Sequence, residues 1–169
     1  MKFLYFSGFC LENESELFQE YKIENDFTVS GFSYGAIKAV QYILKNDTRV
    51  DKLQLFSPAY FNDKSTKYKR MQLIYFGKDS NTYCDNFLQN CGFSSEAKQK
   101  YFSLGTVDEL EELLNYEWDE SIMQSIVDKG TKIEIYLGSE DKIVNTKKAL
   151  EFFRNYGEVY YLKEKEHIL

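Results

Sequence analysis

Three side chains that can cooperate in acyl transfer occur along the chain in the order Ser33, Asp141, His167. Ser33 lies at the centre of the GFSYG segment at 31–35, which has the form GxSxG. Glycines on either side of a serine permit a tight turn, because no Cβ atom obstructs the neighbouring strand or helix. A hydroxyl needs a base within hydrogen-bond reach, and that base needs an orienting partner. The pattern predicts that Ser33 is a nucleophile, His167 its base and Asp141 the partner.

The predicted acid and base each follow a short apolar run in the last third of the chain. Asp141 ends the GSED segment at 138–141, and Glu140 is a weaker candidate for the same role. His167 is the only histidine of the 169-residue chain. An aspartate in such a segment is often a turn or cap residue, and a lone histidine near a terminus is often a surface residue. The prediction depends on the order of the three residues, since each follows a different predicted strand at the edge where α/β sheets carry their sites.

Acyl transfer also needs hydrogen-bond donors for the negative charge that develops on the substrate oxygen. The backbone N–H of Tyr34, at the start of the helix predicted after the turn, is one candidate. The second is the N–H of Phe9, which follows Gly8 at the end of the first apolar run. The adjacent Cys10 is interpreted as a packing residue, because no cationic or histidine partner that would activate a thiol is close in sequence.

Short apolar runs alternate with helical patterns along most of the chain. Strands are predicted at 3–6, 27–29, 53–56, 133–137 and 159–162, helices at 34–45 and 145–156, and a helix or irregular connector at 11–23. This alternation favours about five mostly parallel strands with helices on both faces. Residues 60–130 break the alternation with helical segments only. We therefore predict one α/β domain spanning 1–169, with a helical lid insertion at about 60–130.

Composition and charge exclude several classes of protein. A hydrophobic content of 43% excludes a disordered chain, and a net charge of −6 argues against nucleic-acid binding. No apolar run reaches membrane-spanning length, and the start of the chain turns acidic too early for a secretory signal. The three cysteines fit no zinc or redox spacing, and their odd number argues against a disulfide framework. We expect a cytoplasmic protein without metal, cofactor, membrane or nucleic-acid partner.

Together these segments resemble the α/β-hydrolases, and most closely the short pimeloyl-acyl carrier protein methyl ester esterases of biotin synthesis, of the BioV type. The similar segments are FSGF at the start, VSGFSYGAIKA around the serine, LFSP, KYKRMQL, GSEDKI and EHIL at the end. The resemblance covers nearly the whole chain. It implies a minimal α/β-hydrolase fold and a reaction that removes the methyl group from the terminal ester of pimeloyl-acyl carrier protein while leaving the thioester intact.

The same resemblance implies roles for individual residues. Ser33 would be the nucleophile, His167 the general base and acid, and Asp141 the residue that orients the imidazole. The backbone amides of Phe9 and Tyr34 would form the oxyanion hole. These roles agree with those derived above from the residue types.

The chain departs from the broad hydrolase pattern at three points. Ser7 stands where a histidine often precedes the oxyanion glycine, and Glu166 stands where a glycine often precedes the catalytic histidine. Only 25 residues separate Gly8 from Ser33, too few for a further strand and two helices, which is why we expect a five-stranded core.

Three alternative functions were weighed against this one. The same triad could serve another small-ester esterase or a thioesterase. A hydrolase-fold protein could also bind a partner without turnover. A flavodoxin-like binding domain is disfavoured, because FSGFCLENE after the first run has one glycine and early acids and is poorly suited to phosphate.

A basic segment suggests how an acidic chain could bind an acidic carrier protein. DKSTKYKR at 63–70 contains Lys64, Lys67, Lys69 and Arg70 against one acid. If 64–71 is helical, Lys67 and Arg70 share a face and Lys64 lies one turn earlier. We predict that this face docks the acyl carrier protein that bears the methyl pimeloyl chain, although a solvated face in a lysine-rich chain remains the alternative.

Overall fold

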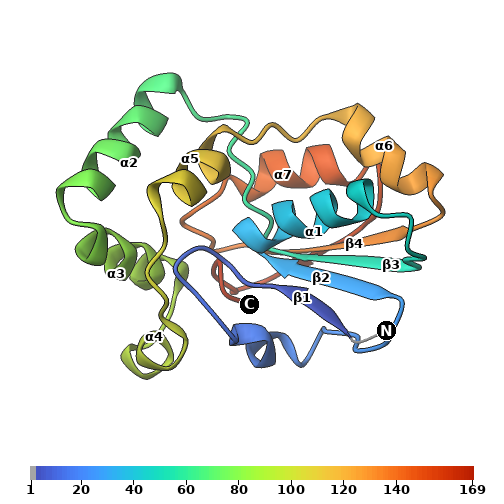
Figure 1. Ribbon diagram of the computed structural model, residues 1–169, viewed down its shortest axis with the longest axis horizontal. Helices are drawn as coiled ribbons and strands as arrows, with labels where there is room; N and C mark the ends of the chain where they lie inside the picture. The colour runs from blue at the N-terminus through green and yellow to red at the C-terminus, as the bar shows by residue number, and fades with distance from the viewer. Residues whose placement is uncertain (1–2) are drawn as a thin grey trace.

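The centre of the fold is a parallel sheet of five strands, seen in the computed structural model, which describes residues 3–169 (Figure 1). The strands are β1 (Leu4–Phe6), β2 (Thr28–Phe32), β3 (Lys52–Phe56), β4 (Lys132–Gly138) and β5 (Glu158–Leu162). They lie side by side in the order β1-β2-β3-β4-β5, and each neighbouring pair is parallel. All five carboxyl ends therefore lie at one edge of the sheet. The predicted class, an α/β fold with five parallel strands, is confirmed.

The register of the sheet aligns the residues that follow neighbouring strands. Phe32 pairs with Phe56, and Phe56 pairs with Tyr136. The ladder continues one step further, because the Ser33 N–H donates to the Phe56 carbonyl at 2.9 Å and the Ser57 N–H donates to the Tyr136 carbonyl at 2.8 Å. The backbones of these two serines are thus fixed by the sheet itself.

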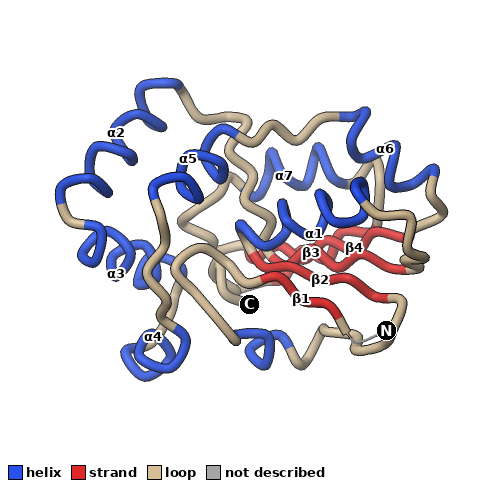
Figure 2. The backbone as a smooth tube through the Cα atoms, in the orientation of Figure 1, coloured by secondary structure: helices blue, strands red, loops and turns tan. Residues whose placement is uncertain are grey.

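The two faces of the sheet are covered differently. The helices α1 (Tyr34–Lys45), α6 (Glu120–Asp128) and α7 (Thr146–Phe153) lie on one face (Figures 1 and 2). The three crossovers from β2 to β5 advance in one direction, and right-handed crossovers of this kind place their helices on one side of the sheet, which accounts for this layer. The opposite face carries the β1–β2 connection, which contains only a short 3-10 helix, η1 (Glu14–Phe18). Of the predicted connector at 11–23, most is irregular.

Aromatic and polar side chains fill the face beneath η1. The Phe18 ring stacks on Phe56, with centroids 4.8 Å apart. Nearby, the Glu134 carboxylate accepts hydrogen bonds from Lys52 at 2.5 Å, from Gln54 at 2.9 Å and from Tyr136 at 2.8 Å. This polar cluster lies toward the amino ends of the strands, away from the predicted triad.

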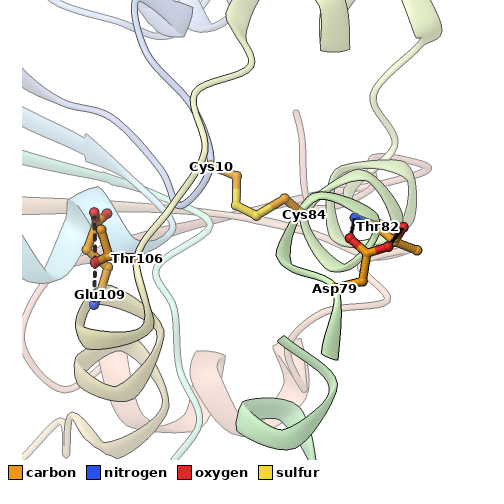
Figure 3. Close-up of a disulfide and its surroundings, with 6 residues drawn as sticks. All are labelled: Cys10, Asp79, Thr82, Cys84, Thr106 and Glu109. Carbon is orange, nitrogen blue, oxygen red and sulfur yellow. Dashed lines mark hydrogen bonds between the residues drawn. A yellow bond between two sulfur atoms is a disulfide. The ribbon is translucent and has the colours of Figure 1, made fainter. Parts of the chain in front are cut away.

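The long segment between β3 and β4 is helical, and four of its helices extend beyond the carboxyl edge of the sheet (Figure 1). These are α2 (Thr66–Lys78), α3 (Ser80–Cys91), α4 (Ser95–Tyr101) and α5 (Val107–Asn115). All four N-termini are capped by side chains. Figure 3 shows two of these caps, in which Asp79 accepts the Thr82 N–H at 3.1 Å and Thr106 accepts the Glu109 N–H at 3.2 Å. We refer to α2–α5 as the lid. By contrast, α6 returns to the sheet layer and packs against α1, because its apolar residues Met123 and Ile126 are buried there.

The expectation for the cysteines is wrong. Cys10 and Cys84 form a disulfide between the loop after β1 and the lid helix α3, while Cys91 is free and buried (Figure 3). The two partners are 74 residues apart in sequence, so local spacing contained no signal for the pairing. They meet because the lid folds over the loop after β1.

Among residues 3–169, no helix has both the length and the apolar character needed to cross a membrane.

Candidate active site

A chain of hydrogen bonds joins Ser33, His167 and Asp141. Ser33 Oγ lies 2.8 Å from His167 Nε2, and His167 Nδ1 lies 2.6 Å from Asp141 Oδ2. Ser33 is 1% exposed and His167 is fully buried. With the imidazole proton on Nδ1, the histidine donates to the carboxylate and Nε2 accepts from the serine hydroxyl. The structure therefore brings together all three residues that the sequence selected, and their arrangement allows a proton to pass from Ser33 to His167.

Ser33 is held on a sharp turn between β2 and α1. Its φ is 55° and its ψ is −113°, a conformation that costs energy for any residue with a Cβ atom. The flanking glycines are required by contact distances. A Cβ on Gly31 would lie 2.1 Å from the Gly35 carbonyl oxygen, and a Cβ on Gly35 would lie 2.0 Å from the Phe6 carbonyl oxygen. The helix can approach the sheet this closely only with glycine at both positions, so the turn fixes where the hydroxyl points.

Asp141 is fixed by its own loop. Its Oδ1 accepts the N–H groups of Ile143 at 2.7 Å and of Val144 at 3.0 Å, which leaves Oδ2 for His167. Glu140 is exposed, and its backbone N–H donates to the Lys165 carbonyl at 2.8 Å. Of the two acidic candidates, it is Asp141 whose carboxylate reaches the imidazole.

His167 belongs to the C-terminal segment 163–169, which contains neither helix nor strand. The imidazole lies against the Phe32 ring, with centroids 5.3 Å apart. The Ser57 hydroxyl donates to the His167 backbone carbonyl at 2.5 Å, and the Ile168 N–H donates to the Cys91 carbonyl at 2.9 Å. Sequence reasoning did not single out Ser57, although a small polar residue directly after a predicted strand was the available signal.

The two amides that the sequence proposed as oxyanion donors follow neighbouring strands, Phe9 in the loop after β1 and Tyr34 at the start of α1 after β2. Tyr34 is the first residue of α1, so its N–H has no acceptor within the helix. Within residues 3–169, the Phe9 N–H donates to no described acceptor. The loop that carries Phe9 is held by Glu14, whose buried Oε1 accepts the Gly8 N–H at 2.9 Å and the Tyr5 hydroxyl at 2.8 Å. Sequence reasoning missed this carboxylate, because a glutamate in a polar connector gives no sign of burial.

A cavity of about 480 Å³ lies between the lid and the loop after Asp141. Its lining combines aromatic and amide side chains from the lid, including Tyr68, Tyr83, Phe87, Gln72, Asn86 and Asn90. Two further lining residues, Lys142 and Ile143, directly follow Asp141 in the sequence, so the cavity borders the loop that carries this triad residue. Ser33 does not line the cavity and is almost fully buried, so its hydroxyl is closed to solvent in this structure.

One hydrogen bond connects the serine turn directly to the lid. The Tyr34 hydroxyl donates to Glu112 Oε1 on α5 at 2.6 Å. Burial, reinforced by this bond, raises the pKa of Tyr34 well above its usual value, so the phenol remains a donor at neutral and mildly alkaline pH. The bond joins the helix that begins at the serine turn to the lid helix α5.

The basic segment lies at the start of the lid, on and just before α2. Lys67 and Arg70 are three residues apart and exposed, and Lys69 is half-buried. The expectation of a helix over 64–71 is wrong at its start, because Ser65 accepts the Tyr68 N–H and begins the helix at Thr66. Lys64 therefore precedes the helix, and its Nζ lies 5.1 Å from the centre of the Tyr68 ring.

Among residues 3–169, no group of three or more His, Cys, Asp or Glu side chains is arranged to hold a metal ion.

Comparison with known proteins places the fold. Comparison with protein-family models gives no match, and comparison with curated protein sequences gives none either. Solved structures do match. E-2-(acetamidomethylene)succinate hydrolase aligns with a TM-score of 0.63 and 11% identity over 98% of this chain and 84% of that one. BioG from Haemophilus influenzae aligns with a TM-score of 0.63 and 16% identity over 99% of this chain and 88% of that one.

A third similar structure is the esterase EaEST from Exiguobacterium antarcticum, with a TM-score of 0.66 and 17% identity over 90% of this chain. The chain spans 63% of the length of that esterase, and 57% of a carboxylesterase from Nitrososphaera gargenis. At these identities the likeness concerns the fold. The chain therefore has the fold of the α/β-hydrolases, in a form shorter than these two esterases.

Proposed function

We propose that the protein is a serine carboxylesterase. The observation that carries the proposal is the buried hydrogen-bond chain from Ser33 through His167 to Asp141, on the turn between β2 and α1. Ser33 Oγ attacks the ester carbonyl carbon while its proton passes to His167 Nε2. The imidazolium then gives that proton to the departing alcohol, which leaves an acyl-enzyme. Water, activated by His167, releases the acid and restores Ser33.

The amides of Phe9 and Tyr34 stabilise the oxyanion in both steps. Preorganised N–H donors aimed at the developing charge are usually a large contribution to catalysis of this kind. The bond from Gly8 to Glu14 and the start of α1 hold the backbone that carries these two amides. The Asp141 carboxylate orients the imidazole and stabilises the imidazolium that forms.

As substrate we propose the methyl ester of pimeloyl-acyl carrier protein, hydrolysed to methanol and the free distal carboxylate. The sequence segments that resemble the short esterases of biotin synthesis support this choice, as does the similarity in fold to BioG. The cavity under the lid also suits such a substrate, since aromatic rings would contact an acyl chain and the amides of Gln72, Asn86 and Asn90 would pair with the amide groups of a carrier arm.

The carrier protein would dock on the basic segment, with Lys67 and Arg70 as the exposed contacts and Lys64 and Lys69 beside them. Because the chain as a whole has a net charge of −6, local positive charge would have to offset long-range repulsion of an acidic partner. Exposed ion pairs are each worth only about 0.2–1 kcal/mol, so a double change is needed to see an effect.

Incubation of the purified protein with methyl pimeloyl-acyl carrier protein, followed by mass spectrometry, tests the reaction. We expect loss of the methyl group, no product with Ser33→Ala, and a fall in kcat on the order of 10⁴-fold with Asp141→Asn. Glu140→Gln is the matched acidic control and should retain wild-type kcat. Hydrolysis of p-nitrophenyl butyrate without action on the carrier substrate would indicate a different small-ester esterase. Failure of a fluorophosphonate to label Ser33 would refute catalysis altogether and favour a partner-binding protein.

The docking proposal has its own test. Lys67→Glu with Arg70→Glu should raise KM for the carrier substrate, with a smaller effect at high salt, and leave the hydrolysis of p-nitrophenyl butyrate unchanged. Lys147→Glu with Lys148→Glu, exposed on α7, makes the same change in net charge away from the lid. An equal rise in KM in both double variants would mean that net charge alone is responsible, and the docking site would be withdrawn.

A further inference from the structure

We infer that Ser57 is a positioning residue that sets the place of His167 relative to Ser33, an inference that rests on the proposed function. The Ser57 hydroxyl donates to the backbone carbonyl of His167 at 2.5 Å, and both residues are fully buried. Ser57 does not contact the reacting atoms. It acts on the backbone from which the imidazole projects.

The position of Ser57 in the sheet makes it a rigid reference point. It directly follows β3, and its N–H continues the ladder to the Tyr136 carbonyl at 2.8 Å. One strand away, the Ser33 N–H continues the ladder to the Phe56 carbonyl at 2.9 Å. Phe56 and Ser57 are consecutive, so the Phe56 carbonyl holds Ser33 and the Ser57 hydroxyl holds His167. The distance between Ser33 and His167 therefore depends on the position of Phe56 and Ser57 at the end of β3.

The backbone of Ser57 is in an unfavourable conformation. Its φ is 42°, in the left-handed region where glycine is favoured and a residue with a Cβ atom is strained. Glycine would adopt this backbone more easily but would provide no hydroxyl. Strained residues at the edge of an active site often have a function. Here a serine in place of glycine provides the hydroxyl that donates to His167.

His167 depends on such an anchor, because its segment has no regular secondary structure. The neighbouring bonds hold other residues: the Ile168 N–H bonds to the Cys91 carbonyl at 2.9 Å, and the Lys165 carbonyl accepts the Glu140 N–H at 2.8 Å. By contrast, the bond from the Ser57 hydroxyl is made to the backbone carbonyl of His167 itself. Without it, a buried carbonyl would lose its donor, and the segment would shift to find another.

A small shift of the imidazole is expected to slow the reaction strongly. A misplacement of about 1 Å can cost about 10²-fold in rate, even when the altered residue does not touch the substrate. Ser57→Gly removes the hydroxyl and also relieves the backbone strain, so it separates loss of the anchor from loss of the fold. Ser57→Ala removes the hydroxyl while retaining the Cβ atom.

We expect both variants to lower kcat for p-nitrophenyl butyrate by about 10- to 100-fold, with KM changed less than about twofold. The unfolding midpoint of Ser57→Gly should stay near that of the wild type. Ser139→Ala is the matched control, because Ser139 Oγ accepts the Glu164 N–H at 2.9 Å in the same C-terminal segment. That variant should retain kcat.

A spectroscopic measurement reports on the position directly. His167 is the only histidine, so its imidazole signals in a tag-free protein need no assignment by mutation. The buried Nδ1 proton in the 2.6 Å contact with Asp141 should give a low-field, slowly exchanging resonance. This resonance should weaken or shift in Ser57→Gly and Ser57→Ala, and remain in Ser139→Ala.

Wild-type kcat in both Ser57 variants would overturn the inference, as would an unchanged imidazole resonance despite a lower kcat. Failure of Ser57→Gly to fold would leave Ser57→Ala to decide by the same two measurements. If the wild-type protein lacks esterase activity, the proposed function fails, while the imidazole resonance still tests whether Ser57 positions His167.

Discussion

Removal of the Tyr34 hydroxyl should make Ser33 more accessible to a small reagent. Tyr34→Phe deletes the donor of the 2.6 Å bond to Glu112 on α5 and retains the backbone amide proposed for the oxyanion hole. Ser33 is 1% exposed, and we expect an electrophile to reach it only when the lid opens. A bond that exists only in the closed state adds its free energy to the cost of opening, and its loss increases the open population.

The magnitude follows from the surroundings of the bond. A hydrogen bond to a charged group is worth about 1.5–3 kcal/mol when buried, but Glu112 is exposed, which reduces the contribution to about 1 kcal/mol. The open population should then rise about fivefold. The raised pKa of Tyr34, caused first by burial and then by Glu112, keeps the phenol protonated below about pH 10. The wild-type bond, and hence the difference between the two proteins, should be constant from pH 7 to 9.

The second-order rate of labelling by a fluorophosphonate measures this accessibility. Tyr34→Phe should be labelled about fivefold faster than the wild type. Tyr75→Phe is the matched control, since Tyr75 is a lid tyrosine that is 47% exposed on α2, and its labelling rate should not change. An unchanged or slower rate in Tyr34→Phe, with a folded protein, would refute the role of this bond in closing the lid.

Two further predictions concern stability. Burial alone would raise the pKa of Glu134, but hydrogen bonds from Lys52 and other neighbours outweigh it, so the pKa is lowered from its usual value of 4.5. The ionised carboxylate therefore stabilises the fold at pH values above 4.5. This stability is lost as the pH falls through the pKa of the folded protein. Urea unfolding should therefore show Glu134→Gln less stable by about 1–2 kcal/mol at pH 7, with a difference that shrinks as the pH falls below 4.5, whereas a constant difference would refute this. Reduction of the Cys10–Cys84 disulfide, which closes a loop with a sequence separation of 74, should lower the unfolding free energy by about 4 kcal/mol, measured by urea unfolding with and without a thiol reductant. A Cys10→Ser with Cys84→Ser double variant should not respond to the reductant, and an equal response in both proteins would contradict the assignment.

The strands and the candidate triad could be predicted because their signals are local. Each strand is a short apolar run, and Ser33, Asp141 and His167 each follow a different run. Because the strands are parallel, their carboxyl ends lie at one edge of the sheet, which brings the three residues close together. The end of β2 was placed too early, at residue 29 instead of Phe32. Gly31 suggested a turn there, whereas pairing of Gly31 with Leu55 and of Phe32 with Phe56 extends the strand up to the serine.

The contacts between segments far apart in the sequence could not be predicted from local pattern. The bond from Tyr34 to Glu112 spans 78 residues and the one from Ser57 to His167 spans 110. Neither pair has a spacing or periodicity that identifies its partner. The start of α2 was missed for a local reason, because Ser65 was not recognised as a helix cap within a run dominated by lysines.

The structure divides the proposed function between two parts of the chain. The sheet edge determines the chemistry, since Ser33 and Ser57 are both fixed by ladder hydrogen bonds and Asp141 by two amides of its own loop. We expect the lid to control access, since Tyr34 contacts it through a hydroxyl that the proposed reaction does not use. Changes at the sheet edge should therefore act on kcat with any ester. Changes in the lid should alter the labelling rate and KM. The effect on KM should be largest with the carrier-bound substrate, because the carrier protein would dock on the outer surface of the lid.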